Sequence, residues 1–318
     1  MQISLDEIHA ARARIAPHVR RTPVIAWDPP EVPVPVTLKL EYLQVGGSFK
    51  ARGACNRLLA ETPERLAAGV VTASGGNHGV GVVYAASRVG VPVTVFLPET
   101  APATTERRLV AMGAQVVRGG RAWDDAWAAA LEYEKSTGAL AVHPFEDPGV
   151  LAGQATVGLE LHEQAPDLDV VVVAVGGGGL IAGVASALAH LSPAARVTGV
   201  EPEGAPSMLE SLRAGRLVEL PEVRTIAGTL APRAVGPHTL SLAQALVKGI
   251  ALVSDDAMCA AMQRLWDDLR ILVEPAGAAA VAALLGGHVD LSGARRAGAI
   301  VCGANVDATL ASRVVGAA

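Results

Sequence analysis

The sequence predicts an α/β protein of two domains, each a mostly parallel sheet flanked by helices. Short apolar segments of strand length alternate with segments of helix length along most of the 318 residues. Hydrophobic residues make up 51% of the chain and charged residues 18%, so a large core can be buried. A chain of this length forms two domains or one large one.

Composition and charge exclude several classes of protein. The formal net charge is −5 and no dense basic stripe occurs, so nucleic acid is not the expected partner. No apolar run is long enough to span a membrane, and the N-terminus forms a capped helix from Leu5 rather than a signal peptide. The three cysteines lie far apart in the chain, which fits a reducing, cytoplasmic setting better than a disulfide framework.

The first half of the chain contains regular strand and helix units. Residues 38–41 alternate apolar and charged side chains, which predicts a strand, and a helix is expected from Lys50. Between residues 53 and 145 we expect strands at 70–73, 93–97, 115–117 and 140–142, and helices at 80–88, 102–112 and 123–137. Repeated units of this kind predict a parallel sheet, so residues 53–145 are taken as a small, mobile α/β domain.

The second half is expected to form the larger domain together with the N-terminal segment. Helices are predicted at 147–164, from 180, at 255–269 and at 275–285, and strands at 170–175, 197–200 and 299–301. Residues 203–236 are rich in glycine, proline and arginine, which predicts a loop with a short helix. The large domain would comprise residues 1–52 and 146–318.

Lys50 has an unusual position for a lysine. It follows Gly46, Gly47 and Ser48 at the expected start of a helix, where the helix dipole disfavours a cation. We therefore expect a lowered pKa and a larger share of neutral amine, which is the form that Schiff-base chemistry requires. The alternative is an ordinary surface lysine at a helix start.

Two glycine-rich segments each join an expected strand to an expected helix. Gly176, Gly177, Gly178 and Gly179 precede Leu180, and such a loop binds phosphate through its backbone N–H groups. The same stretch fits the G-x-G-x-x-A pattern of dinucleotide-binding domains, with Glu201 about twenty residues on, so an NAD-dependent oxidoreductase is the competing interpretation. The second segment, from Ser74 to Gly79, also exposes N–H groups to an anion, unless Asn77 simply caps the helix.

Four motifs together resemble those of the fold-type II pyridoxal phosphate enzymes, which have a fold like that of tryptophan synthase β. They are GGSFKARGA around Lys50, the four glycines, EPAG from Glu274 and VCGAN from Val301. The resemblance covers nearly the whole chain and is closest to the threonine/serine dehydratase and serine racemase branch. It decides between the two interpretations of the glycine loop, since a dinucleotide-binding enzyme has no use for the lysine motif.

The resemblance implies a role for each candidate residue. Lys50 would hold pyridoxal 5′-phosphate as a Schiff base and later take the substrate's α-proton. The other cofactor-binding residues would be Phe49, Asn77, Gly176, Gly177, Gly178, Gly179, Leu180, Glu274 and Cys302, with Cys302 as a neutral group facing the pyridine nitrogen. The substrate carboxylate would lie against Ser74, Gly75, Gly76, Asn77 and His78. The alternatives are an acidic N-terminal group on a helix for Glu274, a small core residue for Cys302 and a structural helix residue for His78.

The implied reaction is β-elimination of water from L-threonine or L-serine, which gives a 2-oxo acid and ammonia. Serine racemase and β-replacement synthase are the alternatives within the family; its racemases carry a serine where this chain has Gly75. Family members that bind a divalent cation carry an acidic residue at the position of Ser207, so we expect no metal site. Residues 225–229 also depart from the family, which leaves the preferred amino acid open. A homodimer is expected.

Overall fold

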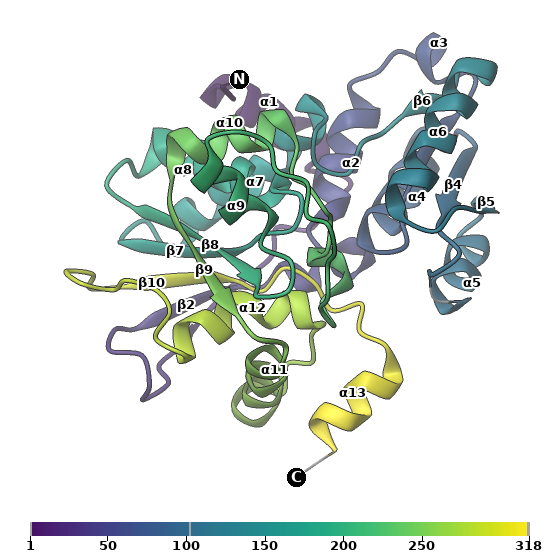
Figure 1. Ribbon diagram of the computed structural model, residues 1–318. Helices are drawn as coiled ribbons and strands as arrows, with labels where there is room; N and C mark the ends of the chain where they lie inside the picture. The colour runs from purple at the N-terminus through teal and green to yellow at the C-terminus, as the bar shows by residue number, and fades with distance from the viewer. Residues whose placement is uncertain (1, 102, 317–318) are drawn as a thin grey trace.

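The computed structural model describes residues 2–101 and 103–316, and it contains two sheets with helices on their faces (Figure 1). The larger sheet has the strand order β1-β2-β10-β7-β8-β9 and the smaller one β5-β4-β3-β6. Every pair of neighbouring strands is parallel except β1 and β2. The predicted α/β architecture with mostly parallel sheets is therefore confirmed.

The larger sheet has helices packed on both faces. Its strands are β1 (Val24–Trp27), β2 (Val36–Lys39), β7 (Val170–Ala174), β8 (Arg196–Pro202), β9 (Val247–Val253) and β10 (Ala297–Ile300). The helix α12 (Pro275–Leu285) packs on one face and is backed by α11 (Asp255–Leu269), while α8 (Gly179–Leu191) packs on the strands with α7 (Pro148–Gln164) and α10 (Pro237–Leu246) outside it. Burial on both faces explains why β7 is entirely apolar.

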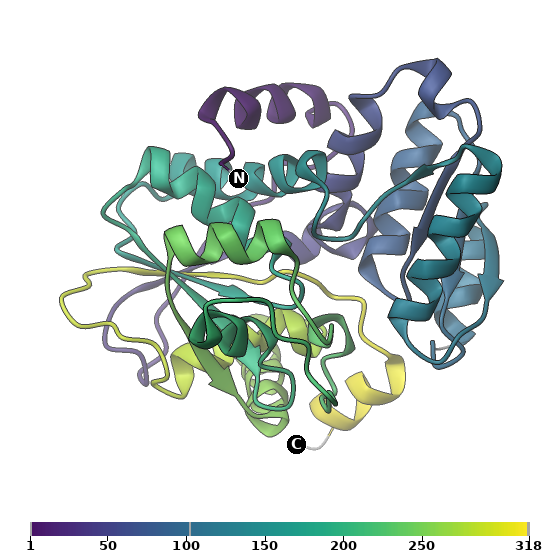
Figure 2. The ribbon, with the colours of Figure 1, turned by 45° about the horizontal axis from the view of Figure 1, so that its top comes forward.

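The smaller sheet follows the same plan in the chain segment between α2 (Lys50–Leu59) and α7. Its strands are β3 (Val70–Ala73), β4 (Val93–Leu97), β5 (Gln115–Arg118) and β6 (Leu140–Ala141), and its helices are α3 (Pro63–Leu66), α4 (Asn77–Val89), α5 (Ala103–Ala111) and α6 (Trp123–Thr137). The helix α2 packs against both α4 and α7, and thereby connects the two halves, which lie side by side in Figure 2 (Figure 2).

The remaining helices are short or peripheral. They are α1 (Leu5–Ile15), α9 (Ser207–Ala214), α13 (Ala308–Val315) and three 3-10 turns, η1 (Glu41–Leu43), η2 (Val45–Gly47) and η3 (Gly228–Leu230). Each described helix is too short or too polar to cross a bilayer.

Most predicted elements are present, but some bounds were wrong. β3, β4, α6 and α11 have the predicted limits. The strand expected at 38–41 ends at Lys39, because the chain turns into η1 at Glu41. The helix expected at 102–112 is described as Ala103–Ala111, and residue 102 lies outside the described residues. α10, β9 and α13 were not predicted; Lys248 and Gly249 interrupt the apolar pattern of β9, which is an edge strand.

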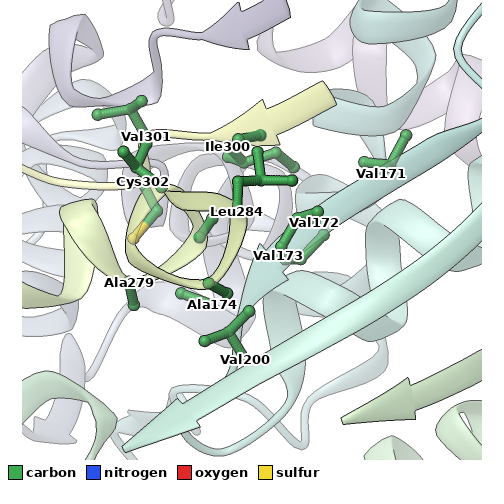
Figure 3. Close-up of a cluster of buried hydrophobic side chains, with 14 of the residues drawn as sticks. Val171, Val172, Val173, Ala174, Val200, Ala279, Leu284, Ile300, Val301 and Cys302 are labelled. Carbon is green, nitrogen blue, oxygen red and sulfur yellow. The ribbon is translucent and has the colours of Figure 1, made fainter. Parts of the chain in front are cut away.

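The larger core consists mainly of valine, alanine and leucine. Figure 3 shows part of it, where side chains of β7 meet those of α12 and the end of β10 (Figure 3). The small alanine side chains of α12 let this helix lie close to the sheet, and ten of its eleven residues are buried. Cys302 follows the carboxyl end of β10 and lies beside this helix, and the candidate site is found at that end of the strands.

Candidate active site

Lys50 begins α2, as predicted, and it is partly exposed. Gly46 and Gly47, which precede it, have φ angles of 77° and 79°, a backbone conformation that glycine adopts without strain. Ser48 then pairs with Gly303, and the backbone N–H of Phe49 donates to the Cys302 carbonyl over 3.2 Å. These contacts hold the lysine loop against the segment that follows β10.

The ε-amine of Lys50 is enclosed and has no carboxylate partner among the described residues. Its Nζ donates a hydrogen bond to the Pro144 carbonyl over 2.8 Å and lies 5.1 Å from the centre of the Phe49 ring. Burial of this amine lowers the pKa of Lys50 to about 8. The lowered pKa was predicted, but from the helix dipole, whereas the cause in the structure is burial. Lys39, by contrast, is buried but bonded to Glu160 over 2.7 Å.

Two histidines stay neutral beside this amine. Burial lowers the pKa of His143 to about 3 and that of His78 well below its ordinary value, and the charge of Lys50 lowers both further. His78 Nε2 lies 3.1 Å from the Val142 carbonyl, which can only accept, so this nitrogen carries the proton. His78 Nδ1 is then a buried acceptor, and it has no protein partner among the described residues.

The tetraglycine loop runs from the end of β7 into α8. A side chain at Gly177 would collide with the Phe145 ring, and one at Gly176 would lie 2.8 Å from the Thr229 carbonyl oxygen. Gly178 has a φ of 88° and Gly179 begins the helix. Only glycine fits this path, which leaves bare N–H groups at the N-terminus of a 13-residue helix. The loop is therefore suited to bind a phosphate.

The second glycine loop leads from β3 into α4. Gly76 is the N-cap of α4 and no side chain of the described residues caps the helix, so the alternative that Asn77 is the cap is wrong. Instead Asn77 Nδ2 donates to Glu274 Oε1 over 2.5 Å. The Ser74 hydroxyl bonds to the backbone of Gly76 within its own loop. Gly75 has no positive φ, and a Cβ there would lie 3.3 Å from that of Ala101.

Glu274 and Cys302 both lie at the start of α12, where Glu274 accepts the hydrogen bond from Asn77. The Glu274 side chain does not cap α12, although its residue is the N-cap, and burial raises its pKa to about 7. A Cβ on Gly303 would collide with its Oε1, so this glycine makes room for the carboxylate. Cys302 Sγ donates to the Ala276 carbonyl over 3.3 Å, and burial raises the pKa of this thiol, which keeps it neutral.

The predicted residues come together around Lys50. The lysine loop contacts Cys302 and Gly303, and these adjoin Glu274 and Asn77. η3 links the two glycine loops, since its Thr229 faces Gly76 with its methyl group and Gly176 with its carbonyl. Sequence reasoning assigned no role to Phe145 or Asn305, and it named Thr229 only within the loop of residues 225–229. Asn305 is the last residue of the VCGAN motif and could have been found there, whereas nothing in the sequence indicated that Phe145 packs on the glycines.

Glu201 is already engaged by the protein itself. Its carboxylate accepts the backbone N–H groups of Met208 and Leu209 over 2.7 and 2.9 Å, and the Ser207 hydroxyl over 3.4 Å. It thus occupies the N-terminus of α9, and burial raises its pKa to about 7. In a dinucleotide-binding domain this glutamate would have to be accessible to bind the ribose, but Glu201 is fully buried. Among the described residues, no three His, Cys, Asp or Glu side chains cluster as metal ligands do.

Comparison with known proteins agrees with this geometry. The sequence model of the family described as pyridoxal-phosphate dependent enzymes matches residues 15–303. The chain belongs to this family. Its cofactor is therefore pyridoxal 5′-phosphate, and the interpretation as an NAD-dependent oxidoreductase is wrong. The described residues fit this cofactor, since they combine an enclosed lysine amine without a carboxylate partner and a bare glycine cradle at a helix N-terminus.

Three family members illustrate the range of relatives. The L-threonine ammonia-lyase of Geobacter sulfurreducens is 42% identical over 97% of this chain and 77% of its own length. The phenylserine dehydratase of Ralstonia pickettii is also 42% identical, over 98% of this chain and 96% of its own. The structure of maize serine racemase superposes with a TM-score of 0.94, at 35% identity, over 97% of this chain and 95% of that one.

Proposed function

We propose that this protein is an ammonia-lyase that converts L-threonine or L-serine to a 2-oxo acid and ammonia. The observation that carries the proposal is Lys50, an amine whose pKa burial lowers to about 8, near the two glycine loops that open α4 and α8. Relatives named as L-threonine ammonia-lyases, similar over nearly the whole chain, support the choice of reaction.

Each residue around Lys50 has a proposed part in holding the cofactor. Lys50 would bind it covalently through Nζ, and the N–H groups of Gly176–Gly179 and Leu180 would bind its phosphate. Phe49 would pack beside the ring. Asn77 would donate to the ring hydroxyl, Glu274 would lie near the ring, and the neutral thiol of Cys302 would face the pyridine nitrogen.

The substrate would bind through its carboxylate at the loop from Ser74 to His78. The N-terminus of α4 lies there without a side-chain cap, so its N–H groups are available to an anion. His78 and His143 are neutral, so neither adds a positive charge that would repel the amino group of the substrate.

Lys50 is the proposed general base. Pyridoxal phosphate supplies an electron sink for the pair left at the α-carbon when the C–H bond breaks. The Lys50 amine takes that proton, because burial keeps a larger share of it neutral near pH 8. For this, the substrate's amino group would first have displaced Lys50 from the cofactor, which frees the lysine amine. The β-hydroxyl would then leave as water with the proton that Lys50 had taken from the α-carbon. L-Threonine thus gives 2-oxobutanoate and ammonia, and the lost water is regained when the nitrogen is released.

Serine racemase is the second candidate, because maize serine racemase has a closely similar fold. Racemisation needs a proton donor on each face of the planar α-carbon. Lys50 would serve one face, but Gly75 has no side chain to serve the other, and the Ser74 hydroxyl is bonded within its loop. We therefore favour elimination.

We further propose that residues 53–145 form a small domain that moves against a large domain of residues 1–52 and 146–318. The two separate sheets support this division. We propose a homodimer in the cytoplasm, without a nucleic-acid or membrane partner. Light scattering of the purified protein tests the dimer, and a mass equal to one chain contradicts it.

A keto-acid assay tests the proposed reaction. The holoenzyme should release a 2-oxo acid and an equal amount of ammonia from L-threonine or L-serine, and Lys50→Ala should release neither. A panel of β-hydroxy amino acids, phenylserine included, then ranks the substrates. A yellow protein that binds the cofactor but yields no oxo acid from any of them would refute the lyase assignment and leave the family assignment intact.

A further inference from the structure

A chain of hydrogen bonds runs from the exposed surface of α5 to the candidate cofactor pocket. Arg108 Nη1 donates to Asn305 Oδ1 over 2.6 Å. Asn305 Nδ2 donates in turn to Asn77 Oδ1 over 2.5 Å. Asn77 Nδ2 then donates to Glu274 Oε1 over 2.5 Å. These three hydrogen bonds thus link α5, a helix of the smaller sheet, to the start of α4 and the start of α12.

The order of donors and acceptors in this chain is fixed from its outer end. A guanidinium group only donates, so Arg108 holds the Asn305 oxygen toward α5. The Asn305 nitrogen then faces Asn77, and the Asn77 nitrogen must face the pocket. Asn77 is thereby presented as a donor, which is the form that binds a cofactor oxygen.

Arg108 also holds the loop that carries Lys50. Its Nη2 donates to the Gly46 carbonyl over 3.2 Å, and Asn305 Nδ2 donates to the same oxygen over 2.9 Å. A Cβ on Gly47 would lie 2.8 Å from Asn305 Oδ1, so the second glycine of this loop makes room for the asparagine. One arginine on the smaller half therefore contacts the lysine loop and orients the asparagine pair.

We propose that Arg108 is a positioning residue that presents Asn77 to the cofactor and fixes the smaller half over the lysine loop. It holds the Gly46 carbonyl directly but orients Asn77 through Asn305, since it has no contact of its own with Asn77 or Glu274 among the described residues. The positive charge of Arg108 also acts to lower the pKa of Glu274, so Arg108 influences the last acceptor in this series of hydrogen bonds. The assignment rests on the proposed role of Asn77 and not on the reaction.

Arg108→Met removes both donors and keeps most of the side-chain volume. We expect it to weaken binding of pyridoxal phosphate about tenfold, since two charge-assisted hydrogen bonds are lost, although at an exposed site. The visible absorption band of bound cofactor should also change, and the unfolding temperature of the apoprotein should not. Arg108→Lys should restore part of the affinity, because one donor can still reach Asn305.

Arg107→Met is the matched control. Arg107 is exposed on the same helix, and its side chain makes no hydrogen bond or ion pair with the described residues. The two variants have the same charge, so a long-range effect of charge would appear in both. The proposal expects parental affinity for Arg107→Met.

A double-mutant cycle tests the route of the effect. If Arg108 acts through Asn305, Arg108→Met should change cofactor affinity little in an Asn305→Ala background. Parental affinity and an unchanged visible band in Arg108→Met would overturn the proposal, as would equal effects in both backgrounds. These readouts need only bound cofactor, so they stay informative if the protein proves not to be an ammonia-lyase.

Discussion

At the scale of single residues, the surroundings of each side chain decide its chemistry. Lys39 is fully buried and bonded to a carboxylate, whereas Lys50 is partly exposed as a residue and its amine is bonded to a backbone carbonyl. Lys50 can therefore lose its proton without leaving a carboxylate unpaired in the interior. Cys302 is likewise kept as a thiol by burial.

Changes at Cys302 test its part in controlling the reaction. Cys302→Ser keeps a neutral group beside Ala276 and should retain most of the elimination activity. Cys302→Asp places a carboxylate there, which should keep the ring nitrogen protonated and shift the balance among elimination, transamination and racemisation. The measurement is the ratio of oxo acid to D-serine formed from L-serine. Identical ratios in parent and both variants, with the fold checked by thermal melting, would make this residue merely structural.

Gly75→Ser should introduce racemase activity. The backbone permits the change, because Gly75 has no positive φ and a Cβ would lie 3.3 Å from the Ala101 methyl group, its one close neighbour among the described residues. The new hydroxyl could then donate a proton to the face opposite Lys50. Chiral chromatography of the products from L-serine should show almost no D-serine for the parent and a measurable amount for the variant. D-serine formed by the parent as fast as pyruvate would reverse the assignment to a lyase.

At the scale of elements, a fully buried ion cluster fixes α2. Arg52, two residues after Lys50, donates to Glu41 and Glu160 over 2.8 Å, and Lys39 donates to Glu160 as well. The cluster ties α2 to β2, η1 and α7. Glu160 lies 108 positions from Arg52, so no local pattern could have indicated this contact.

Arg52→Met should strongly destabilise the protein. Removing one partner leaves Glu41 and Glu160 buried without enough positive charge, which costs about 3–5 kcal/mol of unfolding free energy. Arg65→Met is the control; its ion pair with Glu134 is partly exposed and should contribute less than about 1 kcal/mol. Chemical denaturation of the apoproteins gives both values. Equal small losses would show that the buried cluster contributes little.

Divalent cations should not be needed for activity. The Glu201 carboxylate already accepts two backbone N–H groups at the N-terminus of α9, and Ser207 supplies no negative charge to a cation. Activity should be nearly unchanged after treatment with a chelator. Ser207→Asp restores an acidic residue beside Glu201, and its melting temperature should rise with added calcium or magnesium while that of the parent does not. A loss of parental activity that magnesium restores would contradict this.

At the scale of the whole molecule, the sequence predicted the parts of the site better than their contacts. Glycine loops and Lys50 could be placed, because each joins a strand to a helix and parallel strands align such junctions at one edge. The contacts of Asn305 and Arg108 could not, because 197 positions separate them. β9 was missed because its pattern is weak and its pairing with β8 decides its conformation.

The central claim is that Lys50 carries the cofactor, and the chain's four lysines make it easy to test. Borohydride reduction of the yellow holoenzyme, followed by digestion and mass spectrometry, identifies the modified lysine. Lys39 is held in the buried ion cluster, Lys135 is paired with Glu132 at the surface, and Lys248 is exposed. We expect the cofactor on the peptide that contains Lys50 and on no other. Cofactor fixed to another lysine, or a protein that gains neither colour nor activity with pyridoxal phosphate, would contradict the account.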